Sequence, residues 1–179
     1  RLVVFLPGTA LAPDDYSALI ADFSLPGFHA LGLFYPSAEG QNGCGRSRTA
    51  TPVDLNCTFR ERLRVLTGEA VSTHTNITQP DSIVGRVSKA LAYLGAPWTR
   101  WLDAAGSPRW ERIVVAGHSN GADHAAFLAK TYRTARALFF SGPNDWVGQS
   151  RYGTYSVSAP WLFESGATPP ALRYGFALW

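Results

Sequence analysis

The 179-residue chain contains no methionine and only two cysteines, and its four histidines all lie within the first 124 residues. Without methionine, the printed sequence does not open at a translation start; it opens on an apolar stretch at residues 2–6. We therefore expect that a signal peptide, together with earlier strands, precedes residue 1 in the uncleaved protein.

Charged residues are scarce at 16% of the chain, whereas hydrophobic residues reach 46%, which suits a single domain built on a buried sheet. No apolar run is as long as a membrane span, so we expect no integral membrane segment. The net charge is +3 and the pI is near 9.1, but the arginines are scattered along the chain. Nucleic-acid-binding proteins cluster their basic residues, so we expect no nucleic-acid partner.

The two cysteines, Cys44 and Cys57, lie in a polar stretch at residues 37–79 that shows little hydrophobic periodicity. Their spacing matches no zinc or redox motif, so we expect no metal site. We expect a disulfide between them, the alternative being two unrelated free thiols, and a disulfide predicts a secreted or periplasmic protein. The stretch is too long for a plain connector, and we interpret it as a loop-rich insertion that decorates the strand ends and shapes a pocket.

The chain is organised around residues 112–130, where a short β-branched run is followed by an Ala-rich stretch. The run predicts a strand buried on both faces, and the stretch after it predicts a helix. Between them stands Gly-His-Ser-Asn-Gly at 117–121, a G-x-S-x-G pattern. A strand that turns directly into a helix exposes this serine in a strained conformation, which predicts Ser119 as a nucleophile. The alternative is a serine that only caps the helix.

A serine that attacks a carbonyl needs hydrogen-bond donors, an oxyanion hole, for the negative oxygen that forms. One backbone N–H typically follows the nucleophile, and a second lies in the loop after an early strand. We therefore expect Asn120 to supply the first donor and Thr9 or Ala10 to supply the second. The alternative for the Pro-Gly-Thr sequence at 7–9 is an ordinary turn.

A nucleophilic serine also needs a general base. His124 is the only histidine after Ser119, and it lies on the same predicted helix, where it cannot face the serine from another loop. The remaining histidines are interpreted as structural at His29, solvated at His74 and packed at His118. We therefore expect the protein to continue beyond Trp179 and to carry its base there.

The acid that orients such a base follows the serine along the chain and precedes the histidine. Asp145 comes just after a strand predicted at 136–141, at the edge of the sheet where functional residues gather. It is therefore a candidate acid, although a turn-forming aspartate after Pro-Asn is the favoured alternative.

Further elements follow from periodicity and turn signals. Residues 12–23 predict a helix, residues 28–35 a strand, and residues 81–94 a helix capped by Asp81. The tryptophans between 98 and 110 are expected to pack on a neighbouring helix. Residues 174–179 are expected to begin a further strand.

Taken together, these pieces resemble the α/β-hydrolase superfamily and, within it, a bacterial family of secreted proteins of mostly unassigned function. The resemblance implies a doubly wound, mostly parallel sheet, Ser119 as nucleophile, the oxyanion donors named above, a triad acid just beyond Trp179 and a histidine further on. The matching pieces span most of the chain: residues 6–9, 35–36, Cys44 with Cys57, 81–83 with Arg86, 110–119, 140–143 and 173–176.

The sequence thus predicts a secreted serine hydrolase that acts on carboxylic esters through an acyl-enzyme, without a cofactor. The aromatic content favours a small-molecule or lipid-like acyl substrate. A thioesterase or an acyltransferase would use the same nucleophile chemistry. A non-catalytic binding protein on the same fold is the alternative from a different class. Nothing in the sequence fixes the oligomeric state.

Overall fold

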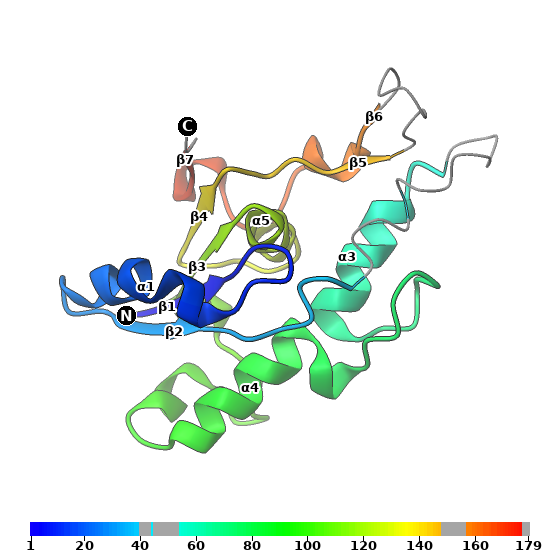
Figure 1. The fold of residues 1–179 in the computed structure, drawn as a ribbon. Coiled ribbons are helices and arrows are strands. Elements are labelled where there is room, and N and C mark those ends of the chain that lie inside the picture. Colours follow the sequence, from blue (N-terminus) through cyan, green and yellow to red (C-terminus); the bar gives the residue numbers. More distant parts are fainter. Residues whose placement is uncertain (40–43, 45–53, 148–156, 177–179) are drawn as a thin grey trace.

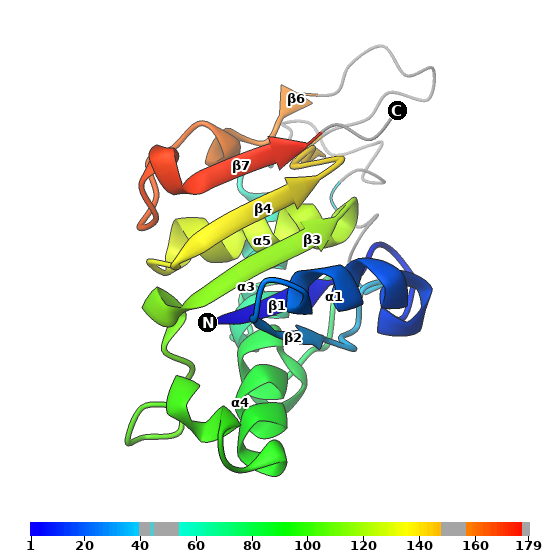
Figure 2. The same ribbon diagram turned by 90° about the vertical axis from the view of Figure 1, so that its left-hand side faces the viewer.

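A computed structural model describes residues 1–39, 44, 54–147 and 157–176 of the chain. Its centre is a five-stranded sheet in which all four strand pairings are parallel, in the order β2-β1-β3-β4-β7 (Figure 2). The strands are β1 (Leu2–Leu6), β2 (His29–Gly32), β3 (Ile113–His118), β4 (Arg136–Phe140) and β7 (Arg173–Phe176). Two short strands, β5 (Trp146–Val147) and β6 (Val157–Ser158), form a separate antiparallel pair.

The helices that connect these strands cover both faces of the sheet (Figure 1). The α-helices are α1 (Ser17–Ser24), α3 (Cys57–Thr67), α4 (Ile83–Leu94) and α5 (Asn120–Thr131). Short 3₁₀ turns are η1 (Pro13–Tyr16), η2 (Gln79–Asp81), η3 (Trp98–Trp101), η4 (Trp110–Arg112), η5 (Pro160–Leu162) and η6 (Pro170–Leu172). No helix of the described ranges is long and apolar enough to cross a membrane.

The alternation of side chains along β1 explains why the chain needs helices on both sides. Leu2, Val4 and Leu6 join the larger core together with residues of α3, α4 and α5. Val3 and Phe5 point to the opposite face, where η1 and α1 cover them. All five residues of β1 are buried, and so are the first five of β3, as expected for parallel strands sandwiched between helices.

The predicted elements are largely present, with three corrections. The helix predicted at 12–23 begins as the 3₁₀ turn η1, and the strand predicted at 28–35 is shortened to His29–Gly32. The helix after residue 81 is capped by Ser82, whose hydroxyl accepts a hydrogen bond from Gly85 N at 3.1 Å; the Asp81 cap was therefore wrong. Asp81 instead forms an ion pair with Arg86.

The stretch at 37–79 is more ordered than its weak periodicity predicts, because it contains the eleven-residue helix α3. The disulfide predicted between Cys44 and Cys57 is present, and it joins the first residue of α3 to the preceding segment. A further strand near 174 is confirmed as β7 at Arg173–Phe176, while residues 177–179 of that prediction lie outside the described residues.

The strand order reverses between β1 and β3. From β1 the chain crosses to β2 on one side, and it then returns to β3 on the other side of β1. Loops that leave neighbouring strands in opposite directions open a crevice at the carboxyl edge of a parallel sheet, where such proteins bind ligands. The loop at 7–10 and the turn at Ser119 both begin at this edge.

Candidate functional site at the end of strand β3

Ser119 lies between β3 and α5 with backbone angles φ 54° and ψ −124°. A positive φ is uncommon for residues other than glycine, and such strain is concentrated at functional sites. The surrounding backbone holds this conformation in place. Ser119 N donates to Phe140 O of β4 at 2.9 Å, and Ser119 O accepts from Ala122 N at 2.8 Å. This is the strand-turn-helix geometry that the G-x-S-x-G pattern predicts.

Two glycines allow this turn because the backbone around it is too crowded for a side chain. A Cβ on Gly117 would lie 2.1 Å from the carbonyl oxygen of Gly121. A Cβ on Gly121 would lie 2.0 Å from the carbonyl oxygen of Leu6 and 2.5 Å from that of Pro7. The spacing of the two glycines therefore has a steric cause. Their lack of side chains lets the loop after β1 pack against the first turn of α5.

The loop after β1 is held beside the turn by side chains from two other segments. Tyr35 donates a hydrogen bond from its hydroxyl to Pro7 O at 2.8 Å. The Tyr16 hydroxyl accepts from Gly8 N at 3.2 Å and lies 2.8 Å from Nδ1 of His118. Ala10 has a positive φ of 54°. The loop that carries the expected donors Thr9 and Ala10 thus lies at the same sheet edge as Ser119; their role as oxyanion donors stays a prediction.

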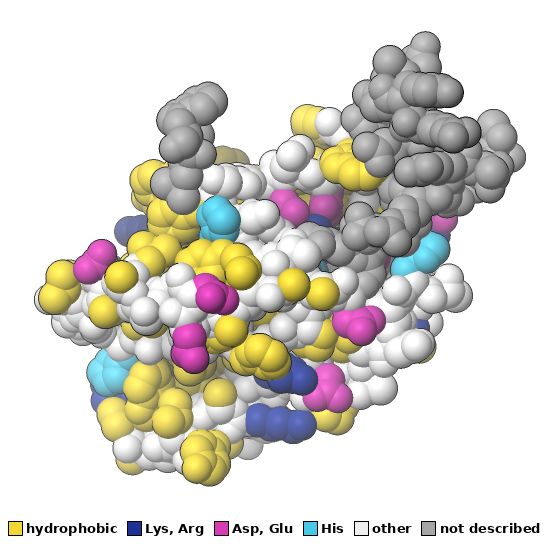
Figure 3. Space-filling model, in the orientation of Figure 1, with side chains coloured by type: hydrophobic (Ala, Val, Ile, Leu, Met, Phe, Trp, Pro, Cys, Tyr) yellow, Lys and Arg dark blue, Asp and Glu magenta, His cyan; other side chains and the backbone are white. Residues whose placement is uncertain are grey.

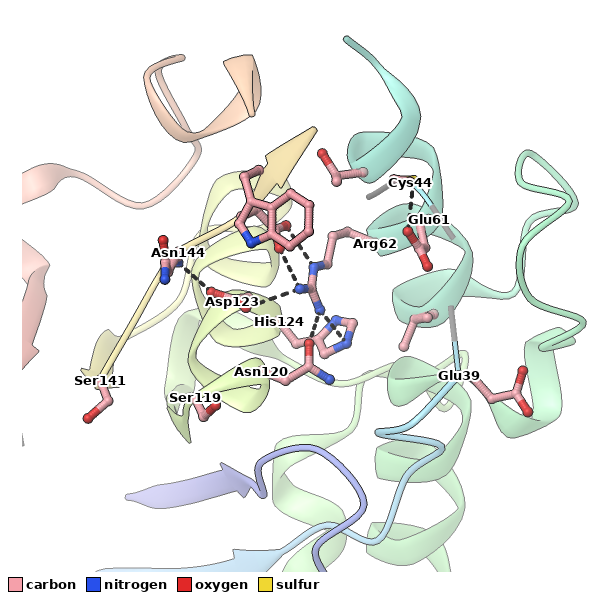
Figure 4. A pocket seen from close by; sticks show the side chains of 14 residues that line it. Glu39, Cys44, Glu61, Arg62, Ser119, Asn120, Asp123, His124, Ser141 and Asn144 are labelled. Carbon is pink, nitrogen blue, oxygen red and sulfur yellow. Dashed lines mark hydrogen bonds and ion pairs between the residues drawn. The ribbon is translucent and has the colours of Figure 1, made fainter. Parts of the chain in front are cut away.

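A cavity of about 260 Å³ opens beside Ser119, between α3, α5 and the segment that follows β4 (Figure 4). In the space-filling view, acidic and basic side chains lie next to each other over this part of the molecule (Figure 3). Most of the lining is polar, which distinguishes this cavity from an ordinary packing defect in the core. The lining residues are Glu39, Cys44, Thr58, Glu61, Arg62, Val65, Ser119, Asn120, Asp123, His124, Ser141, Asn144, Asp145 and Trp146.

Arg62 of α3 is the centre of a buried network in this cavity (Figure 4). Its guanidinium forms a bidentate pair with Asp145, in which Nε donates to Oδ2 at 2.8 Å and Nη2 donates to Oδ1 at 2.6 Å. Nη2 also lies 3.1 Å from Oδ2 of Asp123, whose other oxygen accepts from Asn144 N at 2.6 Å. Trp161 adds a hydrogen bond from Nε1 to Asp145 at 3.1 Å. Two carboxylates from separate segments are thus paired with one cation.

The same guanidinium reaches the first residue after Ser119. Arg62 Nη1 donates to the side-chain oxygen of Asn120 and lies 2.7 Å from Nε2 of His124. Asn120 in turn donates from Nδ2 to Ser37 O at 2.7 Å. The side chain of the residue whose backbone N–H is the expected oxyanion donor is therefore fixed by both α3 and the segment after β2.

Burial shifts the protonation of three groups in the cavity. Burial raises the pKa of Glu61 from 4.5 to about 8, although the Arg62 cation opposes this shift. Burial also raises the pKa of Asp123 to about 6, again against the effect of Arg62. The pKa of His124 is lowered well below 6.5 by burial and by the neighbouring Arg62 cation. At neutral pH, therefore, Glu61 is mostly protonated and His124 is uncharged.

The disulfide and His74 form the one group of metal-type ligands found in the described residues. A ring nitrogen of His74 and the sulfurs of Cys44 and Cys57 lie within 4.8 Å of one another. Both sulfurs are bonded to each other, so neither is available as the thiolate that a metal binds. In this oxidised form the group does not fit a metal site.

Only some of the site residues predicted from the sequence lie together in the structure. Ser119, Asn120 and Asp145 line one cavity. Asp145 directs both of its oxygens to Arg62, with Trp161 as a further donor, and its role as triad acid stays a prediction. All four histidines are in the described residues, and none of them is hydrogen-bonded to Ser119.

Each histidine has an environment of its own. His118 contacts Tyr16, His124 contacts Arg62, His29 packs edge-on against Trp98 and Trp101, and His74 is exposed.

Sequence reasoning assigned no role to Thr58, Glu61, Arg62 or Asp123, which the structure places around the cavity. A signal was present in the sequence for three of them. Thr58 and Arg62 are four residues apart, so they share a face on any helix through the segment. Asp123 is an acidic residue in the first turn of an otherwise Ala-rich helix beside the proposed nucleophile. The two carboxylate partners of Arg62, Asp123 and Asp145, lie 61 and 83 positions away from it in the sequence and left no local pattern.

A scan against models of known protein families finds no match for this chain, and no curated protein matches it significantly. The structure establishes an α/β architecture with a parallel central sheet. The resemblance to α/β hydrolases stays a prediction from the sequence motif.

Proposed function

We propose that this protein is a serine hydrolase of the α/β-hydrolase type that cleaves carboxylic esters through an acyl-enzyme. The observation that carries the proposal is the strained Ser119, at φ 54°, between a buried parallel strand and a helix N-terminus, beside a polar cavity. A serine held this way projects its hydroxyl beyond the edge of the sheet, where a substrate can reach it.

The reaction begins when Oγ of Ser119 bonds to the ester carbonyl carbon and gives its proton to a general base. The carbonyl oxygen becomes negative and is stabilised by backbone N–H groups, of which Asn120 supplies one and Thr9 or Ala10 the other. The backbone N–H of Asn120 suits this role because first-turn amides have no acceptor within their own helix. Collapse of the intermediate breaks the bond to the alcohol, which leaves with the proton. Water then releases the acid by the same sequence of steps.

The base is proposed to be a histidine from outside the printed residues, because the four histidines described here contact other partners. Asp145 and a carboxylate beyond residue 179 are the two candidates for the acid that orients it. The disulfide at α3 is compatible with a secreted protein, and we propose that location.

The test is hydrolysis of p-nitrophenyl butyrate by the full-length natural protein and by two serine variants. Ser119→Ala should lower kcat/KM by about 10³-fold or more, because the nucleophile is lost. Ser141→Ala is the matched variant, since Ser141 lines the same cavity and also has a positive φ, and it should retain activity. Equal activity of the Ser119 variant and the natural protein would refute the proposal.

The same assay separates the related enzyme classes. A thioester of the same acyl group tests for a thioesterase, and added alcohol as acceptor tests for acyl transfer. A folded full-length protein that cleaves none of these compounds would favour a non-catalytic binding protein.

A further inference from the structure

Three buried polar atoms in the described ranges have no hydrogen-bond partner: Thr58 Oγ1, Glu61 Oε1 and His124 Nδ1. Their residues are 6%, 7% and 3% exposed, and all three line the cavity beside Ser119. An unpaired buried polar group destabilises a protein by about 1–3 kcal/mol, so such groups are few in native structures. Three of them around one cavity indicate that the cavity is built to receive hydrogen-bonding groups of a ligand.

The contacts of the three residues assign a hydrogen-bonding role to each atom. Arginine has no acceptor, so Nε2 of His124 must accept from Arg62, and the proton of the neutral ring is on Nδ1. His124 therefore offers a donor. Oε2 of Glu61 lies 2.9 Å from the disulfide sulfur of Cys44, which carries no hydrogen, so this oxygen carries the carboxyl proton. Oε1 of Glu61 is then an acceptor, and the Thr58 hydroxyl both donates and accepts.

We propose that the α3 side of this cavity is a subsite for a neutral polyol group of the substrate, such as the glycerol or sugar portion of an ester. A hydroxyl group both donates and accepts, so adjacent hydroxyls match one donor, one acceptor and one group that does both. The proposal rests on the proposed esterase function and names the class of its substrate.

A neutral ligand fits better than an anion because Arg62, the one cation among the described residues that line this cavity, is already paired with two carboxylates. Arg62 is held by Asp145 and Asp123, and these carboxylates are also hydrogen-bonded by Trp161 and by Asn144 N. The unpartnered atoms belong to Thr58, protonated Glu61 and neutral His124, which carry no charge at neutral pH. Burying an anion there without a free counter-charge would be unfavourable.

The first experiment measures binding rather than catalysis, by saturation-transfer NMR on full-length Ser119→Ala protein. The probes are glycerol and methyl α-D-glucopyranoside, with pentan-1-ol as the probe that has a single hydroxyl. Saturable binding of one or both polyols, and none of pentan-1-ol, is expected. The polyol that binds more tightly identifies the glycerol or the sugar source. Absence of saturable binding for both polyols would overturn the proposal.

The second arm of the experiment uses two variants of the same helix. Thr58→Val removes an unpartnered hydroxyl with little change of shape, so it should weaken polyol binding at least five-fold without lowering the melting temperature. Thr67→Val removes a hydroxyl that donates to Leu63 O at 2.8 Å outside the cavity, and it should leave binding unchanged. Unchanged binding by the Thr58 variant would overturn the subsite.

A kinetic arm separates the subsite from the proposed function. The active protein should prefer glyceryl monobutyrate to butyl butyrate, and Thr58→Val should reduce that ratio of kcat/KM values at least five-fold, since the site then loses a partner for the substrate hydroxyls. Ser119-dependent cleavage of both esters with no preference would refute the subsite alone. Polyol binding without any ester cleavage would refute the esterase function and leave the subsite intact.

Discussion

The two walls of the cavity, α5 and α3, are built in different ways. The α5 wall begins at Ser119, and its shape depends on backbone contacts within a few residues and with the neighbouring strands. The α3 wall is attached through Arg62, whose partner Asp145 lies 83 positions away, and through the Cys44–Cys57 disulfide. The first wall depends on steric fit and the second on paired charge, so different substitutions should disrupt them.

The largest effect is expected from Arg62→Ala, which tests the α3 wall. The substitution leaves Asp145 and Asp123 buried without their cation, and breaking a buried pair in this way destabilises by about 3–5 kcal/mol. Denaturant unfolding measures the change. Arg60→Ala on the same helix is the control, because its ion pair with Asp54 is exposed and should contribute less than about 1 kcal/mol. Equal losses for the two variants would contradict the account of this wall.

A smaller effect is expected from Gly117→Ala, which tests the α5 wall. The new methyl group would lie 2.1 Å from the Gly121 oxygen, so the backbone at Ser119 must shift, at a cost of about 1–3 kcal/mol. Gly175→Ala in β7 is the control because its added Cβ would meet nothing within 4 Å. Thermal unfolding compares the two, and a Gly117 variant as stable as the Gly175 variant would refute the steric argument.

The third effect is expected from Glu61→Gln, and it appears as a dependence of stability on pH. The raised pKa of Glu61, about 8, means that the folded state retains a proton that the unfolded chain releases above about pH 4.5. The free energy of unfolding should therefore fall between about pH 4.5 and 8, by up to about 1.4 kcal/mol per pH unit for one proton.

Glu61→Gln should remove this fall, so that the difference in stability between the variant and the natural protein grows from pH 5.5 to 7.5. The titrations of Asp123 and His124 occur in both proteins and cancel in the difference. Glu111→Gln, which removes an exposed carboxylate, is the control. A constant difference across this pH range would show that Glu61 is ionised in the folded protein.

The difference between the two walls also explains which parts of the molecule could be predicted from the sequence. The strand before Ser119, the turn and the helix after it follow from contiguous residues, because local sterics and apolar pattern determine them. The disulfide was predicted on other grounds: the two cysteines lie in one polar stretch and match no metal or redox motif. The start of β7 was predicted to within one residue. The predicted ends of helices and strands are wrong by a few residues. At Asp81, for example, the neighbouring Ser82 caps the helix instead.

Helix α3 was not predicted from the sequence, and the reason is physical. Its buried face includes Glu61 and Arg62, and a periodicity argument treats charged residues as exposed. The burial of Arg62 is stabilised by partners from α5 and from the segment after β4, which only the folded chain brings together. The polar half of the candidate site was therefore not predictable from the local sequence.

The measurement that tests the central claim most directly is mass spectrometry of the full-length natural protein after treatment with a fluorophosphonate. An activated serine reacts covalently with this reagent, so the account predicts one adduct, located by peptide sequencing at Ser119 and absent from Ser119→Ala. An adduct on another serine of the cavity, such as Ser141, or a folded protein that forms no adduct, would contradict the claim that Ser119 is the nucleophile.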